Sequence, residues 1–100
     1  MTRSHNLPPT HPGELLREDV LPALGRSKAE IARLLEVSRQ TLYDILNEKQ
    51  PLTPAMALRI GKLTGTTPES WLNMQRNYDL RLEAERSAEI IERIPTLEAA

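Results

Sequence analysis

The chain of 100 residues contains no cysteine, no phenylalanine and only three aromatic side chains, Tyr43, Trp71 and Tyr78. Without cysteine it can form neither disulfides nor thiolate metal sites. No run of about 18 apolar residues occurs, and residues 1–10 lack the apolar segment of a secretory signal. We therefore predict a cytoplasmic protein that is neither inserted in a membrane nor secreted. With so few aromatics, the core must consist mainly of Leu, Ile and Ala, which is typical of all-α domains.

The net charge of −1 is low for a protein that binds nucleic acid, but the charge is unevenly distributed. Residues 1–65 carry nine Lys/Arg against seven Asp/Glu, whereas residues 66–100 carry four against seven. The first part, at +2, can face phosphates while the acidic remainder, at −3, stays away from them. So small a positive charge would give one copy only weak affinity for a polyanion such as DNA, and it favours a dimer.

The stretch 27–47 has the pattern of two short helices joined by a tight turn. Ser27 and Glu30 form a capping box at the start of the first helix. Its expected inward residues recur at helical spacing and are Ile31, Leu34 and Leu35. Glu36 lies in the turn, and Ser38 can cap the second helix. The inward residues of that helix are Leu42, Ile45 and Leu46, and its other face is almost wholly polar.

This spacing resembles the helix-turn-helix of the Xre/phage-repressor family, in which the second helix enters the major groove. Ala32 is small where the helices would cross, and Val37 is apolar directly after the turn. Glu36 stands where the family usually has glycine, because the backbone there tends toward a left-handed conformation. A non-glycine residue there costs about 1 kcal/mol. The alternative is an ordinary helical hairpin with a solvated polar face.

We expect the outward residues of the second helix to read bases. Arg39 can pair with guanine O6 and N7, and Gln40 with adenine N6 and N7. The predicted base-reading set is Arg39, Gln40, Thr41, Tyr43 and Asp44. Asp44 could accept from a cytosine amine or orient Arg39, and we favour orientation because an unpaired carboxylate near phosphates is unfavourable. The predicted phosphate contacts are Ser27, Lys28, Ser38 and Lys49.

Proline marks the starts of the other helices. Pro12 follows His11 at the start of the first helix, which Pro22 ends or kinks. The dipeptides Thr53-Pro54 and Thr67-Pro68 begin the fourth and fifth helices. The sequence therefore predicts an all-α fold: a five-helix lambda-repressor-like domain with a central helix-turn-helix and an extended C-terminal helix.

The fifth helix is expected to continue to Arg93, before Pro95 stops it. Its apolar residues could pack in the core or form a two-fold interface, and we assign them to a dimer interface. They are Trp71, Met74, Tyr78 and Leu82. Further along, three isoleucines need a cover from the chain's own core, a second copy or another protein. We predict a flexible N-terminal arm at 1–10, a DNA-binding and dimerisation domain at 11–94 and a C-terminal tail at 95–100.

Three further segments extend the resemblance: HPGELL at 11–16, LTPAMALRIGKLTG at 52–65 and TPESWLNMQRNYDL at 67–80. Over about residues 11–82 they are similar to HigA-type antitoxins of bacterial toxin–antitoxin modules. The most specific pattern consists of Trp71, Asn73, Gln75, Tyr78 and Asp79. The resemblance implies a homodimeric repressor of its own operon that also binds and neutralises a RelE-like mRNA-cleaving toxin.

Other classes of function remain as alternatives. An enzyme is disfavoured because the sequence has no nucleophile–base–orienter set and no glycine-rich phosphate loop. A pure protein-interaction module would lose less affinity with added salt than a DNA-binding protein does. A free-standing Xre-type repressor without a toxin partner is the closest alternative. His5 and His11 have no carboxylate at ligand spacing, so we expect no metal and no cofactor.

Overall fold

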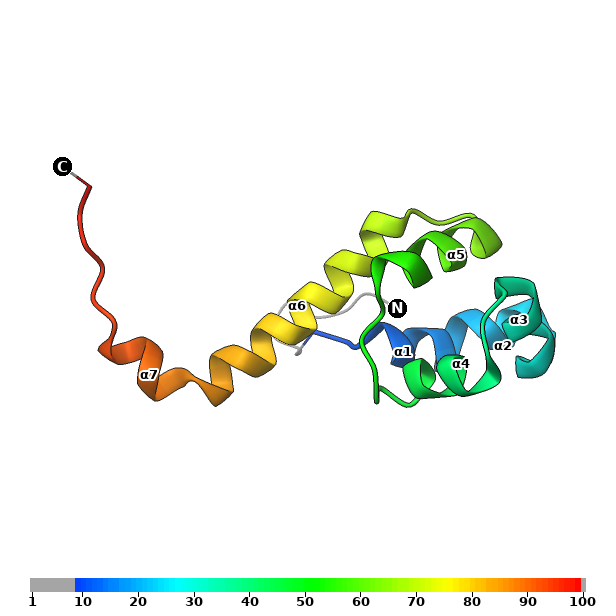
Figure 1. Cartoon of the computed structure of the whole chain (residues 1–100), viewed down its shortest axis with the longest axis horizontal. Helices are drawn as coiled ribbons and strands as arrows, with labels where there is room; N and C mark the ends of the chain where they lie inside the picture. The colour runs from blue at the N-terminus through cyan, green and yellow to red at the C-terminus, as the bar shows by residue number, and fades with distance from the viewer. Residues whose placement is uncertain (1–8, 100) are drawn as a thin grey trace.

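The computed structural model describes residues 9–99, so most of the expected N-terminal arm, including His5, lies outside it. The described part is helical and without strands, as predicted (Figure 1). Its elements are α1 (Pro12–Leu15), the π-helical turn η1 (Leu16–Val20), α2 (Leu21–Leu24), α3 (Lys28–Leu35), α4 (Arg39–Leu46), α5 (Pro54–Thr64), α6 (Pro68–Arg86) and α7 (Ala88–Arg93). None of the helices within residues 9–99 combines the length and the hydrophobicity that a membrane span requires.

The first predicted helix continues past Pro22 instead of ending there. The segments α1, η1 and α2 follow one another without a break, and the amide of Leu21 donates to the carbonyl of Leu16, five residues back. Proline has no amide hydrogen and its ring crowds the carbonyl four residues earlier. The wider π turn directly before Pro22 accommodates that misfit. The helix ends at Gly25, which is left-handed at φ 66°.

Short-range caps fix the other helix starts where the sequence predicts them. A hydroxyl oxygen accepts from the backbone amide three residues on, in the pairs Ser27–Glu30, Ser38–Thr41, Thr53–Met56 and Thr67–Ser70. Each such cap contributes about 1 kcal/mol by satisfying an otherwise unpaired donor. The turn after α3 is also as expected, since Glu36 adopts a left-handed φ of 58°.

The core lies between the first helix, α3, α4, α5 and the start of α6. Its buried apolar residues are Leu16, Leu21, Ile31, Ala32, Leu35, Leu42, Ile45, Leu46, Leu52, Met56, Ala57, Ile60 and Trp71. Leu34, predicted to face inward, is instead 49% exposed. On a helical wheel it lies about 60° outside the stripe that runs from Ile31 to Ala32. It lines an open groove between α3 and α5.

Trp71 corrects the prediction for the C-terminal helix. Its side chain is only 3% exposed, and its Nε1 donates to Oγ1 of Thr66 at 2.7 Å. The assignment of Trp71 to a dimer interface is therefore wrong, because the indole is used to pack α6 onto the core. Met74 and Tyr78 are half-buried, and Leu82 is 39% exposed.

The predicted fifth helix is divided into α6 and α7 at Ser87. Both the amide and the hydroxyl of Ser87 bond to Glu83, the hydroxyl to its carboxylate. Serine competes with the regular helical pattern in this way, and the residues around it are exposed, so no packing opposes the break. The far end of α6 projects from the body and carries α7 away from it (Figure 1).

The first helix approaches α4 backbone to backbone at Gly13. A methyl group built on Gly13 would lie 1.9 Å from the carbonyl oxygen of Ile45, far inside van der Waals contact. Only glycine leaves room for this approach. The spacing between α1 and α4 therefore depends on the missing side chain at this position.

We expect Gly13→Ala to lower the free energy of unfolding by about 3 kcal/mol or more, because two backbones must separate. Urea denaturation of the purified protein measures the loss. Gly25→Ala is the matched control: the position is left-handed but has no atom within 4 Å of the new methyl group. It should cost only about 1 kcal/mol. Equal losses for the two variants would contradict the close approach.

Candidate nucleic-acid interface

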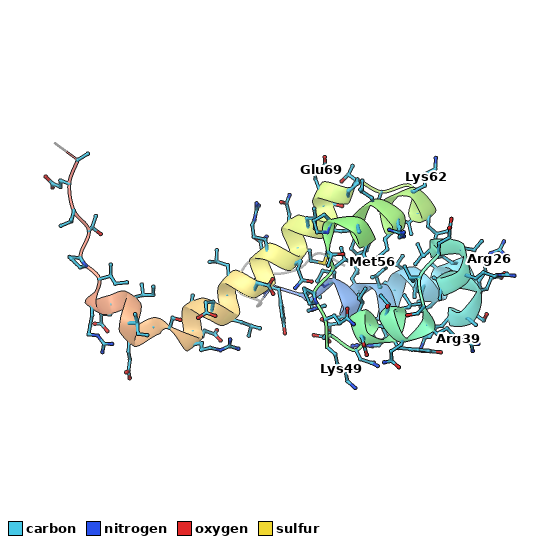
Figure 2. The ribbon with its side chains drawn as sticks, viewed as in Figure 1. Arg26, Arg39, Lys49, Met56, Lys62 and Glu69 are labelled. Atoms are coloured by element: carbon cyan, nitrogen blue, oxygen red, sulfur yellow. The ribbon has the colours of Figure 1, made fainter. Side chains whose placement is uncertain are left out.

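The helix α4 lies on the surface with one face buried and the other polar. Leu42, Ile45 and Leu46, each 1% exposed, fix its rotation about its own axis. The five residues predicted to read bases lie on the remaining arc: Arg39, Gln40 and Tyr43 are exposed, and Thr41 and Asp44 are half-buried. Arg39 and Lys49 lie along the same edge of the body (Figure 2). The structure thus brings the predicted reading residues together on one rigid helix.

The predicted phosphate contacts border this helix. Ser27 and Ser38 are exposed and serve as caps, so each stands at a helix N-terminus, where backbone amides point outward. The ammonium of Lys28 lies 5.7 Å from the centre of the Tyr43 ring. This cation–π contact joins the start of α3 to the outward face of α4. The side chain of Lys49 is exposed just beyond the end of α4.

Two further arginines extend the basic surface, and the sequence reasoning did not select them. The first is Arg33, which lines an open cleft of about 620 Å³ between α3 and the start of α4 together with the predicted Arg39. The second is Arg26, which lies just before α3 and forms an ion pair with Glu30 at 2.9 Å. Among residues 9–99, the side chain of Arg39 has no hydrogen-bonding or ion-pair partner. The outward position of Arg33 on α3 was the available signal in the sequence.

Asp44 does not orient Arg39, and that prediction is wrong. Its Oδ1 accepts from Nε2 of Gln40 at 2.8 Å, and its Oδ2 accepts from Nε2 of Gln50 at 2.9 Å. On an α-helix, Arg39 and Asp44 are separated by about 140° around the axis, whereas Gln40 lies one turn before Asp44. The carboxylate is therefore paired with two amides.

The loop after α4 is held from both sides. The amides of Lys49 and Gln50 donate to the backbone carbonyl of Asp44, at 2.8 and 3.3 Å. On the other side, the amide of Leu52 donates to Oε1 of Gln75 at 2.8 Å. Gln75 is a buried polar residue of α6, 6% exposed, which sequence reasoning noted only as part of a family pattern. The loop is thus tied to both α4 and α6.

His11 supports this loop from the side of α1. It is 3% exposed, and its ring meets that of Tyr78 edge to face, with the centres 5.0 Å apart. Burial lowers the pKa of His11, against opposing contributions from Glu48, Asp79 and the backbone of Gln50. The lowered pKa favours the neutral imidazole, whose Nδ1 accepts from the amide of Gly13 at 2.9 Å and caps α1.

Among residues 9–99, no group of three or more His, Cys, Asp or Glu side chains could hold a metal ion. The chemistry on this face is that of hydrogen bonding and positive charge. Donors and acceptors on a convex helix, flanked by lysine and arginine, suit contact with base edges and phosphates.

Comparison with known proteins gives consistent matches. The helix-turn-helix family model matches residues 16–72. Virulence-associated protein I of Dichelobacter nodosus is 40% identical over 78 residues, which cover 78% of this chain and 72% of that protein. The Pseudomonas aeruginosa antitoxin HigA, solved with the higBA promoter, superposes with a TM-score of 0.84 at 35% identity, covering 90% of this chain and 99% of that one. Antitoxin GraA in complex with its operator gives a TM-score of 0.85 at 39% identity, covering 98% of this chain and 100% of the other.

Proposed function

Since the chain belongs to the Xre-type helix-turn-helix family of HigA-type antitoxins, we propose that it binds operator DNA as a homodimer, represses its own operon and neutralises a RelE-like mRNA-cleaving toxin. Its role is binding rather than catalysis. Repression of an operon requires the protein to be with the DNA, in the bacterial cytoplasm.

The outward face of α4 carries the DNA-binding part of the proposal. Arg39 and Gln40 stand at the N-terminal end of this helix, the end that reads bases in helix-turn-helix proteins. The guanidinium of Arg39 has no partner in the described part of the chain, so contact with guanine O6 and N7 breaks no bond seen there. The similar HigA and GraA structures with promoter or operator DNA support the same use of the fold.

We expect Arg39→Ala to weaken operator binding by about 1–3 kcal/mol and to relax the preference at one base pair, because a bidentate base contact is lost. Lys49→Ala should weaken operator and random DNA alike, because a phosphate contact carries no sequence information. Fluorescence anisotropy with the promoter fragment of the protein's own operon and a shuffled duplex measures both effects.

Added salt is the control in this experiment, because contacts to phosphate weaken steeply as salt rises. The proposal fails if both variants lose the same affinity on both duplexes. Binding that is indifferent to salt would instead favour the interaction-module alternative.

We propose that the dimer contact involves the apolar side chains left exposed on α6, on α7 and directly after α7, which are Leu80, Leu82, Ile90, Ile91 and Ile94. The three isoleucines are 55%, 59% and 59% exposed. Burying such side chains against a second copy contributes about 25 cal/mol per Å². A two-fold dimer would present two copies of α4 to major grooves one helical turn apart.

We expect Ile91→Glu to convert the dimer to a monomer and to raise the protein concentration needed for half-maximal operator binding. Size-exclusion chromatography with light scattering measures the oligomeric state. Leu58→Glu is the matched control, because Leu58 is 63% exposed on α5, away from the proposed contact. If Leu58→Glu dissociates the dimer and Ile91→Glu does not, the contact lies on the α5 side of the molecule instead.

The toxin distinguishes the proposal from a free-standing Xre-type repressor, which would use the same DNA surface. We expect the tagged chain to purify with a small basic protein encoded beside it and to suppress mRNA cleavage by that protein. Co-expression followed by affinity purification and an mRNA-cleavage assay tests both points. If the neighbouring protein neither binds the chain nor cleaves mRNA, the toxin part of the proposal is wrong. Operator binding would then be that of a free-standing repressor.

A further inference from the structure

Three polar side chains on and beside α4 form one hydrogen-bonded set, the Gln40–Asp44–Gln50 set. Each oxygen of the Asp44 carboxylate accepts from a different glutamine amide nitrogen, at 2.8 Å from Gln40 and 2.9 Å from Gln50. An ionised carboxylate can only accept hydrogen bonds. Both glutamines must therefore turn their nitrogen, not their oxygen, toward Asp44.

This pairing fixes how Gln40 faces outward. An amide nitrogen has two hydrogens, so Gln40 keeps one N–H and its carbonyl oxygen for other partners. Adenine offers an N6–H donor and an N7 acceptor in the major groove, and glutamine matches them only with one oxygen and one N–H in the right order. A flipped or freely turning amide would lose that match. Gln40 is exposed and would otherwise turn freely.

Gln50 ties the set to the rigid part of the molecule. Its backbone amide donates to the carbonyl of Asp44, and its side chain is half-buried. Two residues further, the Leu52 amide is held by buried Gln75. The Asp44 carboxylate is thus held by a loop that is itself anchored to α6.

We propose that Asp44 and Gln50 are positioning residues that set the base preference of Gln40 without contacting DNA themselves. Asp44 fixes the orientation of the Gln40 amide, and Gln50 fixes Asp44. This inference rests on the proposed operator binding and assigns Asp44 a different role from base contact. It also assigns a specificity role to Gln50, which lies outside the helix-turn-helix.

A purely structural role predicts a different result, because a glutamine–aspartate pair one turn apart also stabilises an isolated helix slightly. Such a role would change the thermal midpoint but not the choice of base. The decisive readout is therefore base preference, measured with a duplex that the wild-type protein selects from a randomised pool. The position where Gln40→Ala loses its preference identifies the base pair that Gln40 reads.

At that base pair we expect a wild-type preference for A·T of about tenfold. Asp44→Ala should lower it to the level of Gln40→Ala, and adding Asp44→Ala to Gln40→Ala should lower it no further. Asp44→Ala should also bind random DNA more tightly, because a negative charge near phosphates is removed. The charge-matched control is Glu30→Gln, which removes a charge on α3 and should leave the base preference unchanged.

Gln50→Ala should reduce the preference part of the way, and only while Asp44 is present. An equal reduction in the Asp44→Ala background would mean that Gln50 contacts DNA itself and would overturn its assigned role. Asp44→Asn guards against misfolding of Asp44→Ala: it keeps the side-chain size but has one acceptor oxygen in place of two, so it can hold the amide nitrogen of only one glutamine, and we expect a preference between those of the wild type and Asp44→Ala. Selective binding with unchanged preference in both Asp44 variants overturns the inference alone. A wild-type protein that selects no duplex overturns the proposed function, and the inference with it.

Discussion

The backbone contact between Gly13 and Ile45 is the constraint on which the reading surface depends. It brings the first helix against the inner side of α4, which has its own buried arc of Leu42, Ile45 and Leu46. Because a helix with one face locked in a core cannot rotate, its opposite face presents the same residues each time the chain folds. The buried face of α4 thus determines the direction in which Arg39 and Gln40 project from its opposite face.

The features that could be predicted from the sequence are those with short-range causes. The hydroxyl caps and the outward arc of α4 each depend on residues within about one turn of one another, and the left-handed Glu36 was implied by the family resemblance. The errors at Trp71 and Asp44 concern choices made by distant partners, whereas the exposure of Leu34 and the break at Ser87 have local causes. The helical spacing of Trp71 is compatible with a place in the core or at an interface. Its contact with Thr66, just after α5, puts the indole in the core. The prediction that Asp44 orients Arg39 failed because one partner of Asp44, Gln50, lies in the loop after the helix, and helical periodicity does not describe the path of that loop.

The family pattern around Trp71 gains a physical meaning from these contacts. Trp71 packs in the core, Gln75 holds the amide of Leu52, and Tyr78 packs on the ring of His11. Asp79 accepts from Nε2 of Gln75 at 2.9 Å and so leaves its Oε1 facing the loop. This part of α6 therefore braces the loop after α4 and the start of α1. These α6 residues lie outside the two helices of the DNA-binding motif, but they hold the loop that follows its second helix.

The division of charge along the chain follows from the same architecture. The reading face and its flanks carry Arg26, Lys28, Arg33, Arg39 and Lys49, whereas α6 and α7 carry most of the acidic excess and project away from the body. A net charge of −1 is compatible with a DNA-facing surface because α6 separates the two signs in space. The projecting segment, the far end of α6 with α7, also bears the exposed isoleucines. The acidic part of the chain, which phosphate repels, is therefore also the part with apolar side chains exposed for contact with another protein. The length of α6 thus separates a polar surface suited to nucleic acid from an apolar one suited to a protein partner.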